Sequence, residues 1–147
     1  MAAVRTATVT WNGDLATGSG SVTAGTTGLF QDLPVSWASR TEGPEGRTSP
    51  EELLAAAHAA CFSMALSAGL ARAGTPPEHL HVEAEVTFDK VGEAWTVTSS
   101  RLIVVGHVDG MSPEEFDAAA EDASQGCPIS RALKGNVEIS VEATLET

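Results

Sequence analysis

The sequence predicts a single domain of the α+β class that spans residues 1–147. Its length fits one domain, and no long linker, repeat or low-complexity tract divides it. Side chains alternate in the manner of strands over the first 40 residues, and a helical period begins at about residue 49. Strands and helices then follow one another in blocks rather than as regular βαβ units, which favours α+β.

Short strands are predicted for the N-terminal 40 residues. Residues 4–11 alternate as a strand does, and Asn12-Gly13-Asp14 marks the turn that follows. Further strand candidates are residues 20–24 and 34–39, separated by a turn cluster. Residues 41–48 are rich in Gly, Pro and charge, so we expect a loop there.

A long helix is predicted to begin at Ser49 and to end near Gly74. Ser49 suits the N-cap, Pro50 suits the first helical position, and Glu52 is placed to complete a capping box. Apolar side chains occur on all sides of this helix. Because a helix that is apolar all round is usually buried, we expect it to be the centre of the fold.

The C-terminal half is predicted to contain a hairpin, two helices and a last strand. Residues 81–89 and 95–108 alternate in polarity and form an expected antiparallel hairpin around Val91-Gly92. An acidic, alanine-rich helix is expected over 112–124, and a short helix follows the Gly126-Cys127-Pro128 break. Residues 137–145 alternate again and form the last expected strand.

The charge balance argues against two classes of partner. Eight Lys and Arg stand against twenty Asp and Glu, a net charge of −12, so the surface repels nucleic acids and anionic membranes. The N-terminus has no apolar run typical of a signal peptide. The longest apolar stretch, residues 53–70, is interrupted by polar residues and is shorter than the ~20 residues of a typical membrane span. We therefore expect a soluble, cytoplasmic protein.

The chain has two cysteines, Cys61 and Cys127. In a reducing compartment a structural disulfide is disfavoured, so they are either buried free thiols or a redox or catalytic pair. Taken alone, Cys61 is typical of a core residue, because it lies on an apolar helix. Cys127 lies where a helix begins, and backbone N–H groups and the helix dipole favour a thiolate there.

Two segments together resemble the signature of the OsmC/Ohr family of thiol peroxidases. These are residues 49–66, SPEELLAAAHAACFSMAL, and residues 126–130, GCPIS. The likeness extends to residues 11–14 and 39–43. The resemblance implies a long central helix wrapped by antiparallel β-sheet in an intertwined homodimer. It also implies reduction of organic hydroperoxides, with hydrogen peroxide as a further candidate substrate.

The resemblance also assigns roles to four residues. Cys61 matches the peroxidatic cysteine and Cys127 the resolving one, while Glu51 matches the motif glutamate. Arg40 matches the arginine of the osmotically inducible branch of the family. The organic-hydroperoxide-resistance branch takes its arginine from an early loop, and no arginine lies between Arg5 and Arg40, so the chain resembles the former branch. The implied activity uses no cofactor and no metal. An external dithiol is the expected reductant, because the chain contains no CxxC pair of its own.

The implied chemistry requires a cation near Cys61. Only the thiolate attacks a peroxide efficiently, and apolar surroundings raise the pKa of a thiol, so Arg40 is expected to lower it while Glu51 holds the guanidinium. Arg47 in the same loop is the alternative cation, and Arg131 is a candidate for tuning Cys127. Ten residues of helix separate Glu51 from Cys61, a rise of about 15 Å, so we expect Glu51 to act through the arginine or across the dimer. The alternative role of Glu51 is to complement the helix dipole.

His58 lies three residues before Cys61 and raises two further hypotheses, a Cys–His hydrolase dyad and a metal site. Neither an oxyanion hole nor a fourth ligand at diagnostic spacing accompanies it, so we expect a packed or hydrogen-bonded histidine. His79, His81 and His107 are interpreted as ordinary loop or strand residues. The expected apolar walls of a pocket are Leu29, Phe30, Phe62 and Met64. The alternative function is a non-enzymatic sensor that captures a peroxide or another electrophile stoichiometrically.

Overall fold

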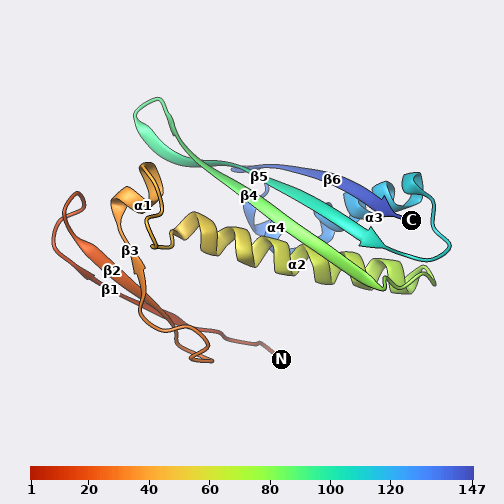
Figure 1. Cartoon of the computed structure of the whole chain (residues 1–147), viewed down its shortest axis with the longest axis horizontal. Coiled ribbons are helices and arrows are strands. Elements are labelled where there is room, and N and C mark those ends of the chain that lie inside the picture. The colour runs from red at the N-terminus through yellow and green to blue at the C-terminus, as the bar shows by residue number, and fades with distance from the viewer. The chain divides into compact units, whose positions relative to one another are not determined.

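The computed structural model describes residues 1–147 (Figure 1). The chain divides into two compact units, residues 1–53 and residues 54–147. Both mix strands with helix, which confirms the predicted α+β class.

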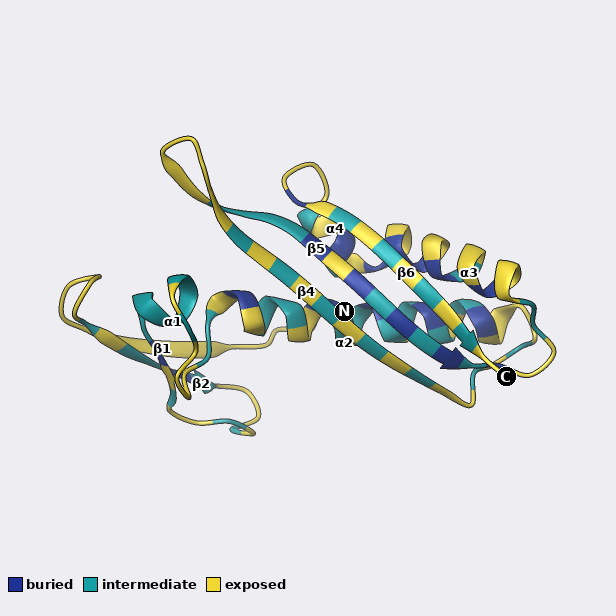
Figure 2. Ribbon diagram, turned by 45° about the horizontal axis from the view of Figure 1, so that its top comes forward, coloured by how far each residue is buried: buried dark blue, intermediate teal, exposed yellow.

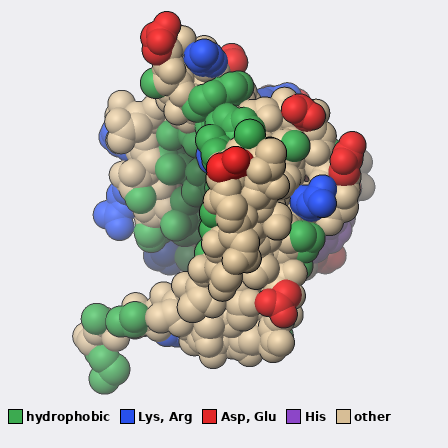
Figure 3. Space-filling model, turned by 90° about the vertical axis from the view of Figure 1, so that its left-hand side faces the viewer, with side chains coloured by type: hydrophobic (Ala, Val, Ile, Leu, Met, Phe, Trp, Pro, Cys, Tyr) green, Lys and Arg blue, Asp and Glu red, His purple; other side chains and the backbone are tan.

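The first unit is built on a three-stranded antiparallel sheet. Its strands are β1 (Ala7–Asn12), β2 (Ser19–Ala24) and β3 (Leu33–Val35), in that order. The predicted turn joins β1 to β2, with Gly13 at φ +91°. Large apolar side chains remain exposed in this unit: Val4, Val9, Trp11, Leu15 and Leu29. Hydrophobic side chains gather on the face of the molecule drawn in Figure 3.

A short helix, α1 (Trp37–Thr41), lies where the sequence predicted the end of a strand. The prediction of strand through Ser39 is therefore wrong beyond Val35. The cause is a capping box: the Ser36 hydroxyl accepts from the Ser39 N–H at 3.1 Å, and the Ser39 hydroxyl accepts from the Ser36 N–H at 3.2 Å. These reciprocal bonds satisfy amide donors that a strand would have paired, so the chain turns into a helix.

The long helix α2 (Pro50–Arg72) begins within the first unit and continues into the second. Its predicted start is confirmed, because the Ser49 hydroxyl accepts from the Glu52 N–H at 3.1 Å. The Glu52 carboxylate accepts from the Thr48 hydroxyl at 2.6 Å. By length and composition alone, α2 is long and apolar enough to cross a membrane, as core helices of soluble proteins can also be.

The second unit contains a three-stranded sheet in the order β4-β5-β6. Strands β4 (His79–Val91) and β5 (Ala94–His107) form the predicted hairpin, with Gly92 at φ +61° in its turn. Strand β6 (Glu138–Glu146) pairs with β5 in parallel, so the expectation of a purely antiparallel sheet is wrong here. A parallel partner needs a crossover, and helices α3 (Pro113–Gly126) and α4 (Pro128–Leu133) supply it.

The core of the second unit lies between the sheet and the helices on one of its faces (Figure 1). Phe62, Leu66 and Leu70 of α2 are buried there against Leu102 of β5 and Phe116 of α3. The other face of the sheet is exposed, which gives β4 and β6 their alternating burial (Figure 2).

Helix α2 is buried along one stripe only, so the expectation of burial on all sides is wrong for the single chain. Within the second unit, its fully buried residues are His58, Phe62, Leu66 and Leu70, which recur every four residues. An apolar stripe stays exposed on another side of the helix: Ala56, Ala57, Ala60, Met64 and Ala68. The side chain of Met64 is 71% exposed.

Candidate active site

The two cysteines come together in the second unit. Cys61 lies in the middle of α2. Cys127 is the C-cap residue of α3 and the N-cap residue of α4. Both are free thiols, Cys61 half-buried and Cys127 fully buried in the core. The two thiols lie close enough to act on each other: hydrogen bonding between them raises the pKa of Cys61 and lowers that of Cys127. Residues 66 positions apart in the sequence therefore form one dithiol site.

The surroundings of the pair favour a thiolate on Cys127 rather than on Cys61. Burial raises the pKa of Cys61, and its hydrogen bond to Cys127 raises it further. Burial also acts to raise the pKa of Cys127, but hydrogen bonds from Cys61, from the backbone N–H and hydroxyl of Ser130, and from the Ile129 N–H outweigh it, so the pKa is lowered. The backbone N–H groups of Ile129 and Ser130 act on Cys127 in the direction that the sequence predicted.

One positive charge acts on Cys61 from within the same unit. The guanidinium of Arg131 on α4 works to lower the pKa of Cys61, as does the Ile129 N–H, although burial prevails. The sequence suggested that Arg131 would tune Cys127, whereas in the structure its charge acts to lower the pKa of Cys61. A thiol of raised pKa needs a further cation or an approaching substrate to ionise readily at neutral pH.

His58 is a buried, hydrogen-bonded histidine, as predicted. Its side chain is fully enclosed, with Nδ1 at 2.7 Å from the Ser100 hydroxyl and Nε2 at 2.8 Å from the Ser130 hydroxyl. Burial lowers the pKa of His58, so the ring is neutral at neutral pH. Neither Ser100 nor Ser130 is singled out by the sequence, because only the packing of α2, β5 and α4 brings them to one imidazole.

Arg40 and Glu51 form an ion pair within the first unit. Arg40 Nη2 lies 2.6 Å from Glu51 Oε1, and Arg40 Nε lies 3.2 Å from both carboxylate oxygens. The Arg40 guanidinium also lies over the Trp37 ring, 5.5 Å from its centroid. Glu51 is buried and the arginine side chain is half-buried. The predicted Arg40–Glu51 contact is therefore present, whereas Arg47 makes no such pair with a carboxylate.

A cavity of about 410 Å³ opens beside Arg40 in the first unit. Apart from Arg40 and Ser36, its lining is apolar: Val9, Trp11, Leu15, Val22, Val35, Trp37, Pro50 and Leu53. None of the residues that the sequence suggested as pocket walls lines it. Phe62 is instead fully buried in the core of the second unit, and Leu29 and Met64 are exposed. The arrangement suits an apolar group held next to a guanidinium.

Glu51 and Cys61 lie on the same continuous helix, as the sequence predicted. The step of ten residues from Glu51 to Cys61 corresponds to a rise of about 15 Å. Because two side chains on one straight helix do not span that length, Glu51 does not contact Cys61 of its own helix.

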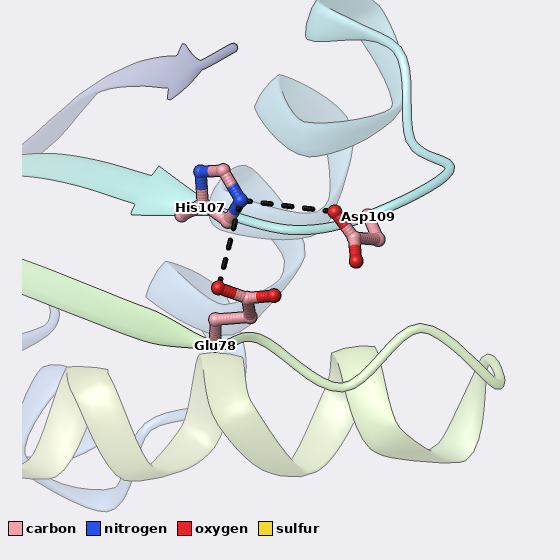
Figure 4. Close-up of side chains that lie close together, drawn as sticks. All are labelled: Glu78, His107 and Asp109. Atoms are coloured by element: carbon pink, nitrogen blue, oxygen red, sulfur yellow. Dashed lines mark ion pairs between the residues drawn. The ribbon is translucent and has the colours of Figure 1, made fainter.

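A further group of side chains with metal-ligating atoms lies at the end of the β4–β5 hairpin (Figure 4). His107 Nε2 is 3.6 Å from Glu78 Oε2 and 3.7 Å from Asp109 Oδ1. The His107 ring also stacks on His79 of the neighbouring strand, with centroids 5.8 Å apart. Glu78 and Asp109 are exposed, and exposed acidic groups of this kind are common without a metal. From the sequence, His79 and His107 were expected to be ordinary loop or strand residues, and no pattern indicated that Glu78, His107 and Asp109 lie together.

Comparison with known proteins places the chain among hydroperoxide-related redox proteins. Residues 43–142 match the family described as OsmC-like protein. The chain is 39% identical over 132 residues to peroxiredoxin OsmC of Escherichia coli (strain K12), covering 90% of this chain and 91% of that protein. It is 33% identical over 120 residues to the organic hydroperoxide resistance protein OhrA of Bacillus subtilis (strain 168), covering 78% and 79%.

Solved structures show the same fold. An organic hydroperoxide resistance protein OsmC from Legionella pneumophila aligns with a TM-score of 0.68 at 26% identity, covering 97% of this chain and 99% of that one. An OsmC-like protein from Mycoplasma pneumoniae aligns with a TM-score of 0.72 over the whole of both chains. Its 18% identity supports the fold alone.

Proposed function

The chain belongs to the OsmC-like protein family, and we propose that it is a thiol-dependent peroxidase that reduces organic hydroperoxides without a cofactor. The observation that carries this proposal is that two free thiols, Cys61 and Cys127, are packed together in the second unit and act on each other's pKa. A neighbouring thiol traps an oxidised cysteine as a disulfide before further oxidation. The relatives are named as a peroxiredoxin and as organic hydroperoxide resistance proteins, which supports a hydroperoxide-related redox role.

In the first step Cys61 acts as the peroxidatic residue. Its thiolate attacks the terminal oxygen of the hydroperoxide, so an S–O bond forms and the O–O bond breaks. The sulfur is oxidised to a sulfenic acid, and the alkoxide takes a proton and leaves as the alcohol. Cys61 suits this role better than Cys127, because Cys61 is half-buried whereas Cys127 is enclosed in the core.

In the second step Cys127 acts as the resolving residue. Its thiolate attacks the Cys61 sulfur, so an S–S bond forms and the S–O bond breaks, with hydroxide leaving and taking a proton to become water. An external dithiol then reduces the disulfide by thiol–disulfide exchange and is itself oxidised. The chain holds no third cysteine that could serve as an internal reductant.

Arg40 and Glu51 are proposed to complete the site. The Arg40 guanidinium stabilises the Cys61 thiolate and the departing oxygen, and the Glu51 carboxylate holds that guanidinium in one orientation. The apolar cavity beside Arg40 supports a preference for organic hydroperoxides, because it can take the hydrocarbon part of such a substrate.

The active form is proposed to be a soluble, cytoplasmic homodimer in which residues 1–147 act as one domain. The support is the apolar stripe of α2 around Met64, which the single chain leaves exposed. A helix with an apolar face in water is stabilised when a partner covers that face.

Turnover of cumene hydroperoxide with dihydrolipoamide tests the proposed function. The wild type should consume many equivalents per site, and Cys61→Ser should consume none. Cys127→Ser should keep the first oxidation and accumulate overoxidised Cys61, detected by mass spectrometry. Consumption of no more than one equivalent by the wild type would establish stoichiometric capture instead. Loss of the first oxidation in Cys127→Ser would reverse the two cysteine roles.

A further inference from the structure

The buried His58 has no part in the two chemical steps, yet it is joined to the resolving cysteine by hydrogen bonds. Its Nε2 pairs with the Ser130 hydroxyl at 2.8 Å, and the Ser130 hydroxyl is among the hydrogen-bonding groups that lower the pKa of the Cys127 thiol. At the other end, Nδ1 pairs with the Ser100 hydroxyl at 2.7 Å. Both serines are buried, and no buried side-chain nitrogen or oxygen lacks a partner.

The order of donors along this chain follows from the protonation of the ring. A neutral imidazole has one donor nitrogen and one acceptor nitrogen, and each hydroxyl has one proton to donate. If Ser130 donates to the Cys127 sulfur, its oxygen accepts from His58 Nε2–H. The Nδ1 atom is then the acceptor, and Ser100 donates to it. Each bond in this arrangement points its proton toward Cys127.

We propose that His58 is a positioning residue for Cys127, because its Nε2–H directs the Ser130 hydroxyl at the Cys127 sulfur and keeps that sulfur ready as a thiolate. The other groups that act on this sulfur from the packed elements are the Cys61 thiol of α2 and the backbone N–H groups at the start of α4. Arg131 supplies the one positive charge that acts on the dithiol pair from α4.

The consequence for turnover rests on the proposed function. The attack of Cys127 on the Cys61 sulfenic acid requires the electron pair of a thiolate. In this step the S–S bond forms, the S–O bond of Cys61 breaks, and hydroxide leaves and takes a proton to become water. Weakening the Ser130 bond lowers the thiolate fraction, so the disulfide forms more slowly. Cys61 then spends longer as a sulfenic acid and is overoxidised more often.

Two matched variants test the role of His58 directly. The amide nitrogen of Gln can take the place of Nε2 and reach Ser130, whereas the shorter Asn side chain can take the place of Nδ1 and reach Ser100 only. Both are placed in a Cys61→Ser background, which leaves Cys127 as the only thiol and keeps a hydroxyl at position 61. The thiolate absorbance of Cys127 is then titrated against pH.

His58→Asn should raise the pKa of the Cys127 thiol and lower its thiolate fraction roughly tenfold below that pKa. His58→Gln should leave the titration close to that of the background protein. In a Ser130→Ala background His58→Asn should add nothing, because the two residues act in series. An unchanged titration in His58→Asn, or equal shifts in Asn and Gln, would overturn the proposal.

The titration does not depend on peroxide chemistry, so it separates this inference from the proposed function. If the wild type does not turn over peroxide but His58→Asn shifts the Cys127 titration, the peroxidase proposal is rejected and the positioning role of His58 is retained. Circular dichroism and urea denaturation confirm that each variant is folded. If His58→Asn fails to fold, Ser100→Ala is used instead. This variant removes the hydroxyl that donates to His58 Nδ1, so it should shift the Cys127 titration in the same direction. The absence of a shift in Ser100→Ala would overturn the proposal.

Discussion

Two contacts hold the Arg40 guanidinium in the first unit. The Glu51 carboxylate accepts hydrogen bonds from both Nε and Nη2, and the Trp37 ring lies beneath the guanidinium. A planar group fixed by a carboxylate and an aromatic ring loses little further freedom when an oxyanion approaches. In a chain with only eight Lys and Arg residues, such a fixed cation is scarce.

Arg40→Met should lower kcat/KM for cumene hydroperoxide roughly a hundredfold, because the proposed role of Arg40 is to stabilise the thiolate and the departing oxygen. Arg40→Lys should restore part of the loss, since it keeps the charge but not the planar fork. Steady-state kinetics measure both effects.

Arg47→Met is the matched control for Arg40→Met. It removes the same charge from the same loop region, where Arg47 forms no ion pair with a carboxylate. Its kcat/KM should stay within about twofold of the wild-type value. Equal losses in the two variants would show that overall charge, rather than Arg40, matters.

The buried His58 should make stability depend on pH. Its pKa is lowered by burial from an ordinary value of 6.5, so below that value the unfolded chain binds a proton that the folded chain does not. The free energy of unfolding should therefore fall as the pH drops below about 6.5, by up to about 1.4 kcal/mol per pH unit. Urea denaturation at several pH values measures this.

His58→Gln should reduce that pH dependence, because glutamine does not titrate. His81→Gln is the control, since His81 is exposed on β4. A pH dependence that is the same in the wild type and in His58→Gln would contradict the assignment.

At the scale of elements, Gly106 of β5 lets helix α3 approach the sheet. A Cβ atom on residue 106 would lie 2.6 Å from Phe116 Cζ and 2.9 Å from Leu80 Cδ2. Phe116 belongs to the buried core of the second unit and Leu80 packs against that core, so both side chains have little room to move.

Gly106→Ala should lower the free energy of unfolding by about 1–3 kcal/mol through overpacking, measured by urea denaturation. Gly126→Ala is the control, because an added Cβ at the end of α3 meets nothing within 4 Å. That control should be neutral or slightly stabilising. A Gly106→Ala protein as stable as the control would mean that α3 packs less closely on β5.

The elements also show where sequence patterns were sufficient. The start of α2, the β4–β5 hairpin and the break at Cys127 were predicted because each carries local chemistry: a serine N-cap, a turn glycine, or a proline after a helix. Helix α1 was missed because the Ser36–Ser39 capping box is short and follows a strand-like run. The parallel β6 was missed because strand direction is set by the crossover and not by alternation.

At the scale of the whole molecule, the exposed stripe of α2 predicts self-association. Sedimentation at micromolar concentration should show a dimer for the wild type. Met64→Glu should raise the dimer dissociation constant at least roughly a hundredfold, because it would place an unpaired carboxylate in an apolar interface.

Ser140→Glu is the control for this experiment. It adds the same charge at an exposed position of β6, where Glu138 and Glu142 are already exposed. Its sedimentation should match that of the wild type. A monomeric wild type, or an unaffected dimer in Met64→Glu, would contradict the proposed homodimer.

The sequence by itself determined the family, the fold class and the two cysteines, because these depend on local patterns and on residue types at fixed spacing. It also determined that Arg40 and Glu51 are candidates for one ion pair, which the structure contains. Only the tertiary structure decided that Ser100 and Ser130 hold His58, and that the surroundings of Cys127 favour its thiolate. The reason is physical: hydrogen bonding and desolvation at a buried group are set by side chains distant in sequence, which meet only when α2, β5 and α4 pack together.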